Sequence, residues 1–477
     1  MSDKHIQHRN PVTIHRKRIG ENDFKKSDQK FTKQRKLSEK ESDITDTENK
    51  AMVKLFLICK DNPDEVFRRV SKEYGPVFTL WFGTTPQVFV TDIELSREAL
   101  RKNDFAGRSD SYFGKQLSND EFSDIIFADY GHKWEALRRV AHSAIQKYST
   151  NERLISVATD SVDRTVKAML DKEGVGNAFD PRSYIYLMFL NILATSAFGQ
   201  SYDMEDKEFK YLKYGMKDQA MEIGGRILLW EFSPIIRFID RKRVAKQIKV
   251  TRGVIDLLRN KFIKHYDDYN ESIERDFCDA LISAKNDALR DGKESAPYLT
   301  DANLSMAIID LFIAGTDTTQ QTFQWILLLM TYYPEMQKKL RQEIESQIGD
   351  RMPTHEDRNR CHYVMAFIAE TLRARNPLPS ALPHKAVGII LRNDSDWENA
   401  EKFIPERFVD SEGQFITTRP KAYIPFGVGR RVCPGERLAI ADLFLVLVRF
   451  LQSTQDYDLV LDSHNGIEAD PNISEAQ

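Results

Sequence analysis

Apolar residues recur at helical spacing along most of this chain, as in helices that pack one face against a core. Near the N-terminal end, two short runs alternate instead with the period of two that is typical of a strand. The pattern predicts a mainly α protein with small β-sheets. The predicted helices cover residues 63–74, 93–102, several segments of 134–290, 301–330, 332–347, 363–375 and 438–451, and the predicted strands cover residues 77–82 and 87–90.

Residues that begin or end regular structure support these boundaries. Pro63 stands where a proline is tolerated, in the first turn of a helix, and Asp92 is a natural cap for the helix that follows it. Residues 83–86 (GTTP) predict a hairpin between the two strands. Pro377 ends the helix before it, because the residue that precedes a proline avoids the helical conformation. Further helix breaks are expected at residues 174–176 and 233–234.

The predicted helix 301–330 is nearly long enough to cross a membrane. Asp310, Asp317 and the glutamines at 320–321 interrupt its apolar run, so we expect a buried core helix. The N-terminal end shows neither a spanning apolar run nor the apolar core of a signal peptide, and residues 52–59 are too short a stretch to span. We therefore expect no N-terminal membrane anchor in this chain.

Residues 1–50 are mostly polar and charged and show almost no apolar periodicity. We expect a disordered N-terminal tail over residues 1–50, followed by a single domain over residues 51–477. The basic residues of the tail leave a second interpretation open, in which it is an arm for a membrane surface or a targeting signal.

Composition narrows the classes of function. The chain has 477 residues, enough for a large core, and its net charge of −3 argues against a nucleic-acid-binding protein that depends on phosphate contacts. No C-x-x-C pair or zinc-finger spacing stands out. Scattered cysteines are typical of reduced thiols in a cytosol-facing protein. They are Cys59, Cys278, Cys361 and Cys433.

Cys433 lies in a glycine-rich segment, residues 426–435 (FGVGRRVCPG), that leads into the predicted helix 438–451. Glycines let a backbone turn where side chains would clash. A helix N-terminus and nearby arginines lower the pKa of a thiol, so we expect Cys433 to be a thiolate and a metal ligand. The plainer interpretation of a lone cysteine is a buried, inert thiol.

This segment matches F-G-x-G-x-R-x-C-x-G at every fixed position and so resembles the haem-binding signature of the cytochromes P450. The resemblance implies that Cys433 is the axial ligand of the iron of haem b (iron protoporphyrin IX), a ligand type that favours O–O cleavage. It also implies that Phe426 packs under the haem, that Arg431 pairs with a haem propionate and that Gly435 lets the next helix approach the ring. The expected fold is that of a cytochrome P450, with a long central helix over the haem.

A second motif, residues 314–319 (AGTDTT), lies in the middle of the long predicted helix. The hydroxyl of Thr318 can bond the carbonyl four residues back and loosen the helix, and an acid among apolar residues is costly without a function. A threonine-rich patch of a core helix is the plain interpretation. The segment resembles the A-G-x-D/E-T-T motif of the same family, which implies a proton relay at Asp317 and Thr318, room for oxygen at Gly315 and substrate near Ala314.

Trp134 and Arg138 stand four residues apart, so their polar groups point the same way on a helix. A core tryptophan followed by an exposed arginine would show the same spacing. The pair resembles the family's W-x-x-x-R, which implies that it binds a haem propionate. Arg108 and His384, within F-A-G-R and P-H, resemble two further propionate contacts in related members.

Glu370 and Arg373 are three residues apart on one helical face, a spacing that is common on surfaces. With Arg407 in P-E-R-F, they resemble the family's E-x-x-R motif and its partner. The resemblance implies a buried Glu–Arg–Arg network that supports the fold and takes no part in catalysis.

Several basic residues flank the elements expected on the thiolate side of the haem: Lys133, Arg138, Arg139, Arg430 and Arg437. The simple interpretation of these residues is an ordinary solvent-exposed surface with charges of both signs. By resemblance, this basic proximal face would dock an acidic, NADPH-dependent flavoprotein reductase.

The sequence departs from the family pattern in two places. Residues 384–405 are shorter than the pattern by roughly 20 residues, enough for two or three short strands, and the C-terminal segment is short as well. We therefore expect part of the sheet region to be missing, with consequences for the substrate channel.

The resemblance is strongest to the animal microsomal group that contains the steroid 17-hydroxylases and drug-metabolising enzymes. It implies a haem-dependent monooxygenase that inserts one oxygen atom from O2 into an apolar steroid or xenobiotic, at the cytosolic face of the endoplasmic reticulum membrane or, without an anchor, as a cytoplasmic or peripheral protein. Two alternatives stay open: a haem-binding isoform without turnover, which the shortened sheet region favours, and a haem-thiolate isomerase that needs no reductase.

Overall fold

The computed structural model describes residues 63–82, 85–118, 123–149, 152–223, 226–273, 275–385, 387–389 and 396–460. The predictions made for the tail 1–50 and for the short C-terminal segment lie outside these residues.

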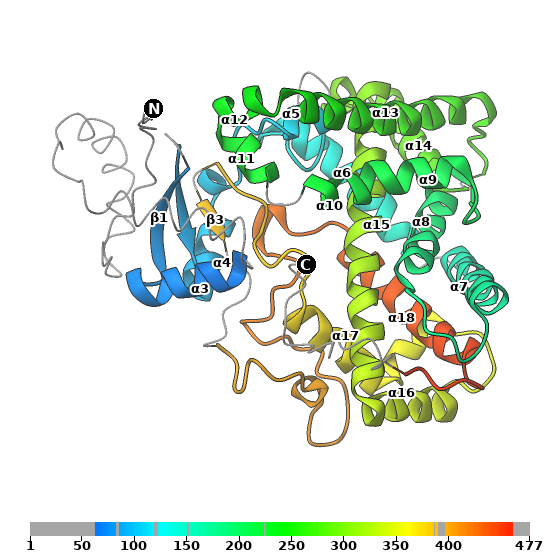
Figure 1. Ribbon diagram of the computed structural model, residues 1–477. Coiled ribbons are helices and arrows are strands. Elements are labelled where there is room, and N and C mark those ends of the chain that lie inside the picture. Colours follow the sequence, from blue (N-terminus) through cyan, green and yellow to red (C-terminus); the bar gives the residue numbers. More distant parts are fainter. Residues whose placement is uncertain are drawn as a thin grey trace, which may run out of the picture.

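Helices dominate the described part of the chain, and a small sheet stands to one side of them (Figure 1). The α-helices are α3 (Pro63–Tyr74), α4 (Ile93–Arg101), α5 (Gly114–Leu117), α6 (His132–Tyr148), α7 (Glu152–Glu173), α8 (Arg182–Phe198), α9 (Lys207–Lys213), α10 (Gln219–Ile223), α11 (Arg226–Phe232), α12 (Pro234–Ile239), α13 (Arg241–His265), α14 (Phe277–Arg290), α15 (Asp301–Tyr332), α16 (Pro334–Gln347), α17 (His362–Ala374) and α18 (Glu436–Ser453).

Shorter elements connect these helices. The 3-10 helices are η2 (Asn103–Phe105), η4 (Tyr266–Asp268), η5 (Ala296–Tyr298), η6 (His355–Asn359), η8 (Pro405–Phe408) and η9 (Gly429–Arg431), the π-helical turn is η3 (Tyr214–Asp218), and the strands are β1 (Val77–Phe82), β2 (Thr85–Val90) and β3 (Val387–Ile389). The predicted mainly α architecture is therefore confirmed.

Most of the predicted boundaries agree with the structure to within two residues. Asp92 caps α4 as expected, because its carboxylate accepts a hydrogen bond of 2.9 Å from the backbone N–H of Leu95. The long central helix α15 has 32 residues and stays helical through the motif at 314–319. Strand β2 begins at Thr85, two residues before the predicted start.

The sheet has the strand order β1-β2-β3. Strands β1 and β2 form the predicted antiparallel hairpin, with Val77 opposite Val90, and β3 lies parallel to β2, with Val387 opposite Val88. Strand β3 comes from the segment that the sequence marked as shortened. Among the described residues, that segment contributes this single short strand to the sheet.

The core lies where α15 packs against α8 and α18 in the helical part of the molecule (Figure 1). Phe323 of α15 packs against Phe189 of α8 and Phe450 of α18, with ring centroids 5.5 and 5.7 Å apart. Even so, none of the described helices has the length and apolar composition that a bilayer crossing requires. The prediction that residues 301–330 form a buried core helix is thus confirmed.

Candidate functional site

Cys433 lies in the tight turn that joins η9 to α18. Its backbone N–H donates to the carbonyl of Phe426 at 2.9 Å, which closes the loop. Gly429 has a φ of +79°, and a Cβ there would lie 2.0 Å from the carbonyl oxygen of Leu100, so no other residue fits without moving α4. Cys433 is an exposed residue of this loop by its accessible surface, although protein atoms crowd around its sulfur.

The expected low pKa of Cys433 is wrong for the protein alone. Loss of water around the sulfur raises the pKa of the thiol above its ordinary value. The backbone N–H groups of Gly435 and Glu436 and the charge of Arg138 act in the opposite direction but do not outweigh it. The thiolate therefore depends on a bound cation, since metal coordination deprotonates a thiol outright.

Three arginines predicted to bind propionates lie together beside Trp134. The guanidinium carbon of Arg431 is 4.1 Å from the centroid of the Trp134 ring, and that of Arg138 is 5.3 Å away on the same ring. Burial, then repulsion from Arg108 and Arg138, lowers the pKa of Arg431 to about 9. Burial likewise lowers the pKa of Arg108 to about 10, and Arg138 adds to that shift. We call Arg108, Arg138 and Arg431 the arginine cluster.

The hydrogen bonds of the arginine cluster go to neutral carbonyl oxygens. Arg431 donates to Ala106, Ile125 and Ala128, at 2.8, 3.2 and 2.7 Å. The other two members donate to the carbonyls of Ile126, Leu382, Pro383 and Val432. In the part of the chain that the structure describes, none of the three forms an ion pair with a carboxylate. The charges of Asp124 and Asp129 offset part of the repulsion, but the cluster has no direct carboxylate partner among the described residues.

The two remaining predicted propionate contacts also reach this region. The indole N–H of Trp134 donates to the carbonyl of Ile125 at 3.0 Å. His384 forms an isolated β-bridge with Arg108, and its Nδ1 contacts the carbonyl of Phe105. Burial, then the charge of Arg108, lowers the pKa of His384 to about 4, so its imidazole is neutral at pH 7. The sequence motifs thus converge in space.

Two buried acids that the sequence motifs did not single out as site residues hold the segment that these donors contact. Asp310 of α15 accepts a hydrogen bond of 2.6 Å from the backbone N–H of Ile125. Asp124 accepts from the backbone N–H of Ala128 at 3.2 Å and from the hydroxyl of Ser118. Burial, then the charge of Asp124, raises the pKa of Asp310 well above its ordinary value. The acid at 310 was visible in the sequence as an interruption of an apolar helix, but its partner was not.

The acid–alcohol pair lies in the middle of α15. The hydroxyl of Thr318 donates to the carbonyl of Ala314 at 2.7 Å, the contact that the sequence suggested. Ala314 is exposed, although α15 is largely buried. A Cβ at Gly315 would lie 2.8 Å from a methyl carbon of Leu193, so this glycine lets α15 approach α8. Its predicted role in leaving room for oxygen stays a prediction.

Asp317 points away from Thr318 toward a chain of amide side chains. Gln320 and Gln321 each donate a hydrogen bond to its carboxylate, at 3.1 and 3.0 Å. The carbonyl oxygen of Gln320 in turn accepts from the ammonium of Lys217, on η3, at 3.4 Å. Burial raises the pKa of Asp317, against the opposing effect of Gln320 and Lys217. Lys217 is a residue that sequence reasoning missed, because nothing local marks it.

The predicted Glu–Arg–Arg network is present. Arg373 donates two hydrogen bonds to the carboxylate of Glu370, at 2.7 and 2.8 Å, and both side chains are buried. The guanidinium of Arg407 lies 3.4 Å from the same carboxylate, and its other nitrogens donate to the carbonyls of Glu398 and Asn399. The bidentate geometry thus belongs to Arg373, and Arg407 makes a single, longer ionic contact.

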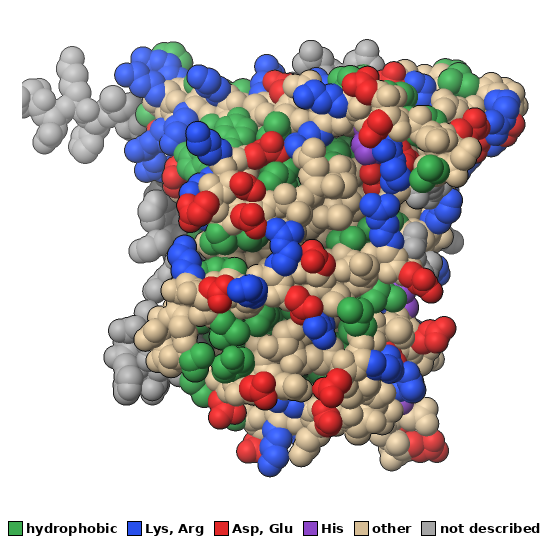
Figure 2. Space-filling view, turned by 90° about the vertical axis from the view of Figure 1, so that its right-hand side faces the viewer, with side chains coloured by type: hydrophobic (Ala, Val, Ile, Leu, Met, Phe, Trp, Pro, Cys, Tyr) green, Lys and Arg blue, Asp and Glu red, His purple; other side chains and the backbone are tan. Residues whose placement is uncertain are grey.

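The predicted basic face is divided. Arg139, Arg430 and Arg437 are exposed, whereas Arg138 turns inward to the carbonyl of Val432. Lys133 donates to the hydroxyl of Ser123 at 2.8 Å. Positive and negative side chains are interspersed on another face of the molecule, the one on the right of Figure 1 (Figure 2).

The donor set fits a haem. A thiol sulfur is presented by a loop at the start of a helix, and three half-buried arginines repel one another beside an indole N–H. Two propionate carboxylates would supply the negative charge that the arginine cluster lacks. Phe426, half-buried, packs against the main core beside this loop.

Comparisons with known proteins agree with this geometry. The family model "Cytochrome P450" matches residues 47–388 and 386–459, in two segments that meet in the region predicted to be shortened. A steroid 17-alpha-hydroxylase/17,20 lyase from Gallus gallus is 30% identical over 80% of this chain and 80% of that protein. The corresponding enzyme from Oryzias latipes is 29% identical, with 82% and 81% covered.

Two further relatives extend the comparison. Cytochrome P450 2U1 from Homo sapiens is 29% identical over 82% of this chain and 75% of that protein. A solved zebra fish cytochrome P450, described as a structure with progesterone, superposes with a TM-score of 0.71 at 26% identity. The superposition covers 82% of this chain and 92% of that one.

Proposed function

This chain belongs to the cytochrome P450 family of monooxygenases, and we propose that it oxidises an apolar small molecule of the steroid or xenobiotic class. Haem b would be its cofactor, and an NADPH-dependent flavoprotein reductase would be its electron donor. The catalytic unit would be a single domain over residues 51–477 behind the tail 1–50. The arginine cluster beside Cys433 is the observation that carries the cofactor assignment.

The bound haem would supply the oxygen and electron-transfer chemistry. Cys433 would ligate the iron through its sulfur, and the helix-start N–H groups of Gly435 and Glu436 would stabilise the thiolate. Arg108, Arg138 and Arg431, with Trp134 and the neutral His384, would hold the propionates. In this arrangement the propionate carboxylates would replace backbone carbonyls as hydrogen-bond partners of the arginines and of Trp134.

Thr318 and Asp317 would move protons toward the oxygen site. The Thr318 hydroxyl now donates to its own helix, so it can turn to donate elsewhere at the cost of one hydrogen bond of about 1 kcal/mol. Burial raises the pKa of Asp317, a shift in the direction that a carboxyl group acting as a proton donor requires. Ala314, exposed on the same helix, would border the substrate.

The substrate class rests on relatives. The relatives include steroid 17-alpha-hydroxylases, and the zebra fish structure is described with progesterone. The largely apolar helix α15 supports a substrate of the same polarity. Titration of the purified haem protein with steroids, followed by the shift of its Soret band, tests this assignment. Absence of a shift with any apolar ligand would reject it.

The central test is the absorption spectrum of the reduced protein with carbon monoxide. We expect the thiolate-type Soret shift in the wild-type protein and its loss in Cys433→His. The variant Cys361→Ala, which removes a buried thiol elsewhere, is the matched control and should keep the shift. A histidine-type spectrum in the wild-type protein would overturn the assignment of Cys433.

The alternative of a haem-binding isoform without turnover is not favoured by the comparisons, which give monooxygenase relatives over most of the chain. Substrate-dependent consumption of NADPH with reductase separates the two. Product that forms without NADPH and reductase would instead indicate an isomerase.

Membrane contact is part of the proposal, at the cytosolic face of the endoplasmic reticulum. Helix α12 exposes Ile235, Phe238 and Ile239, with 59, 70 and 68% of their surfaces accessible. Basic residues follow at once in α13. Such an apolar ridge beside positive charge suits a membrane surface. Flotation with anionic vesicles should weaken in Phe238→Glu and not in Val175→Glu, an exposed apolar position between α7 and α8.

The reductase would dock on Arg139, Arg430 and Arg437, the exposed part of the basic face. Steered association weakens with salt. We expect charge reversal at Arg139 and Arg437 to lower the rate of haem reduction by the reductase at low ionic strength, and unchanged reduction by dithionite is the control. An unaltered reductase-dependent rate would contradict this face.

A further inference from the structure

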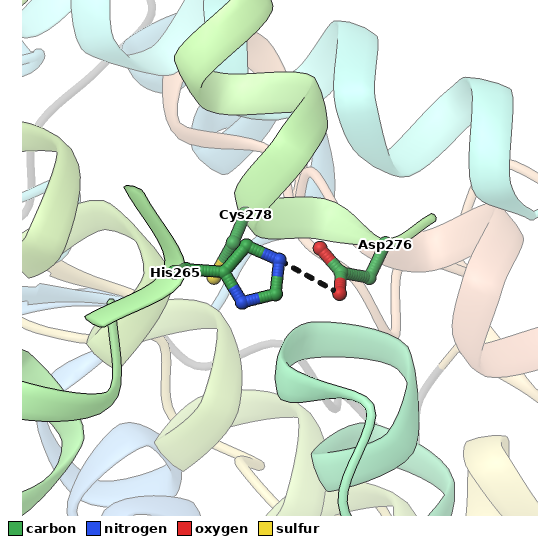
Figure 3. Close-up of side chains that lie close together, drawn as sticks. All are labelled: His265, Asp276 and Cys278. Atoms are coloured by element: carbon green, nitrogen blue, oxygen red, sulfur yellow. Dashed lines mark ion pairs between the residues drawn. The ribbon is translucent and has the colours of Figure 1, made fainter. Parts of the chain in front are cut away.

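A second group of metal-binding side chains lies far along the chain from Cys433. His265, the last residue of α13, meets Asp276 and Cys278 at the start of α14 (Figure 3). One ligand atom from each residue, a nitrogen, an oxygen and a sulfur, lies within 4.8 Å of the other two. Among the described residues this is the one group of its kind, and its chain spacing resembles no zinc-finger pattern.

The distances already approach those of a coordination sphere. Nε2 of His265 is 3.1 Å from Oδ2 of Asp276 and 3.2 Å from Oδ1 of Asp279. Ligand atoms at the corners of a tetrahedron around zinc are about 3.3 Å apart when the bonds are about 2.0 Å long. The nitrogen–oxygen edge is therefore in place, and the sulfur, within 4.8 Å of both atoms, has to approach by at most about 1 Å.

Of the three ligand atoms, the oxygen and the sulfur are free for this purpose, whereas Nε2 of His265 also lies 3.3 Å from a guanidinium nitrogen of Arg275, which a bound cation would displace. Asp276 uses Oδ1 to cap α14, accepting from the backbone N–H of Asp279 at 3.1 Å, and it turns Oδ2 toward His265. The thiol of Cys278 is fully buried, and its sulfur has no hydrogen-bond partner in the described part of the chain. Burial, then the charges of Asp276 and Asp279, raises the pKa of that thiol well above its ordinary value, so it stays neutral unless a cation displaces its proton.

The surrounding charge favours a cation. Asp268, Asp276 and Asp279 are the carboxylates here, and Arg275 is the guanidinium that faces them. Arg275 keeps Asp279 occupied through hydrogen bonds of 2.7 and 3.0 Å. With a neutral imidazole, the group therefore carries an excess of negative charge that a divalent cation would balance.

We propose that His265, Asp276 and Cys278 bind one Zn²⁺ through Nε2, Oδ2 and Sγ, with water as the fourth ligand, and that this ion fixes the junction of α13 and α14. Imidazole, carboxylate and thiolate together suit zinc better than magnesium or calcium, which prefer oxygen ligands. The site is separate from the haem and does not depend on it.

The competing arrangement is an ion pair between protonated His265 and Asp276. Both carboxylates raise the pKa of His265 against the effect of burial, so the pair can exist without metal. The two arrangements differ in what they require of Cys278, because the ion pair leaves its sulfur unused.

The test uses the haem-loaded full chain, treated with a chelator and then titrated with Zn²⁺ alone against a chromogenic chelator. We expect one tightly bound zinc per chain, with binding at least tenfold weaker in Cys278→Ala and in His265→Gln. Cys361→Ala is the control, since Cys361 is equally buried beside Glu343 and Asp357 but belongs to no such group among the described residues. It should bind zinc as the wild-type protein does.

X-ray absorption at the zinc edge of the wild-type protein decides the matter if a variant fails to fold. The proposal requires one sulfur at about 2.3 Å and nitrogen or oxygen neighbours at about 2.0 Å. Three results would overturn the proposal and leave the ion pair as the explanation. They are a dissociation constant for Zn²⁺ above micromolar, an X-ray absorption spectrum without a sulfur neighbour, and zinc binding by folded Cys278→Ala that equals that of the wild-type protein.

Discussion

Two groups of buried or half-buried arginines in this molecule differ in charge balance. Arg373 donates both of its forked hydrogen bonds to Glu370. The arginine cluster of Arg108, Arg138 and Arg431 donates to carbonyl oxygens, and its members repel one another. Burial alone therefore does not reveal the role of an arginine. We propose that the group with its own carboxylate supports the fold and that the group without one binds an anionic cofactor.

Removing the carboxylate from the balanced group should have the largest effect on stability. In Glu370→Gln, Arg373 stays buried without a counter-charge, and we expect a loss of about 3–5 kcal/mol in the free energy of unfolding. Denaturant unfolding of the haem-free protein measures it. A loss below about 1 kcal/mol, comparable with that of an exposed pair, would break the distinction between the two groups.

Removing one charge from the unbalanced group should instead weaken the cofactor. Arg431→Gln keeps hydrogen-bond donors but loses the charge-assisted contact to a propionate, worth about 1.5–3 kcal/mol. We expect haem to dissociate roughly 10–150 times faster, as measured by transfer to apomyoglobin. The exposed Arg437 provides the control variant Arg437→Gln. If haem loss is unchanged while the unfolding free energy falls, the cluster is a fold support after all.

Asp317 and Lys217 are an intermediate case, in which opposite charges are joined through Gln320. The folded protein raises the pKa of Asp317, so it favours the protonated carboxyl. That contribution to stability is fully present below the ordinary aspartate range and is lost as pH rises through the raised pKa. The unfolding free energy of Asp317→Asn, measured at each pH, should therefore rise relative to that of the wild-type protein as pH increases from 4 toward 7. A difference that is independent of pH would contradict the shift.

A surface ion pair should contribute least to the free energy of unfolding. Arg430 and Glu135 are 4.0 Å apart and partly exposed. Arg430→Gln should change the unfolding free energy by no more than about 0.5 kcal/mol. A larger loss, measured in the same denaturant series as Glu370→Gln, would show that exposure is a poor guide to the strength of ionic contacts here.

Local sequence patterns predicted the parts of the site that depend on local geometry. The three-residue spacing of Glu370 and Arg373 and the four-residue contact of Thr318 with Ala314 follow from helix geometry, and both are confirmed. The pKa of Cys433 was predicted wrongly, because desolvation depends on how the whole chain surrounds the sulfur.

Contacts between distant segments gave no local signal. Lys217 meets Gln320 across 103 residues, from a π-helical turn that the sequence did not reveal. The pairing of β3 with β2 was equally hidden, because the prediction for that segment came from its shortened length. The described sheet has three strands, which is compatible with the prediction that part of the sheet region is absent.

The reach of Arg431 to the carbonyl of Ala106 has a consequence for the order of events during synthesis. These two residues are 325 positions apart. A ribosome adding about 5–20 residues per second delivers Arg108, Trp134 and Arg138 well before Arg431 and Cys433. The proposed haem pocket is thus incomplete in the nascent chain until Arg431 and Cys433 have been synthesised, so stable haem insertion would follow their synthesis.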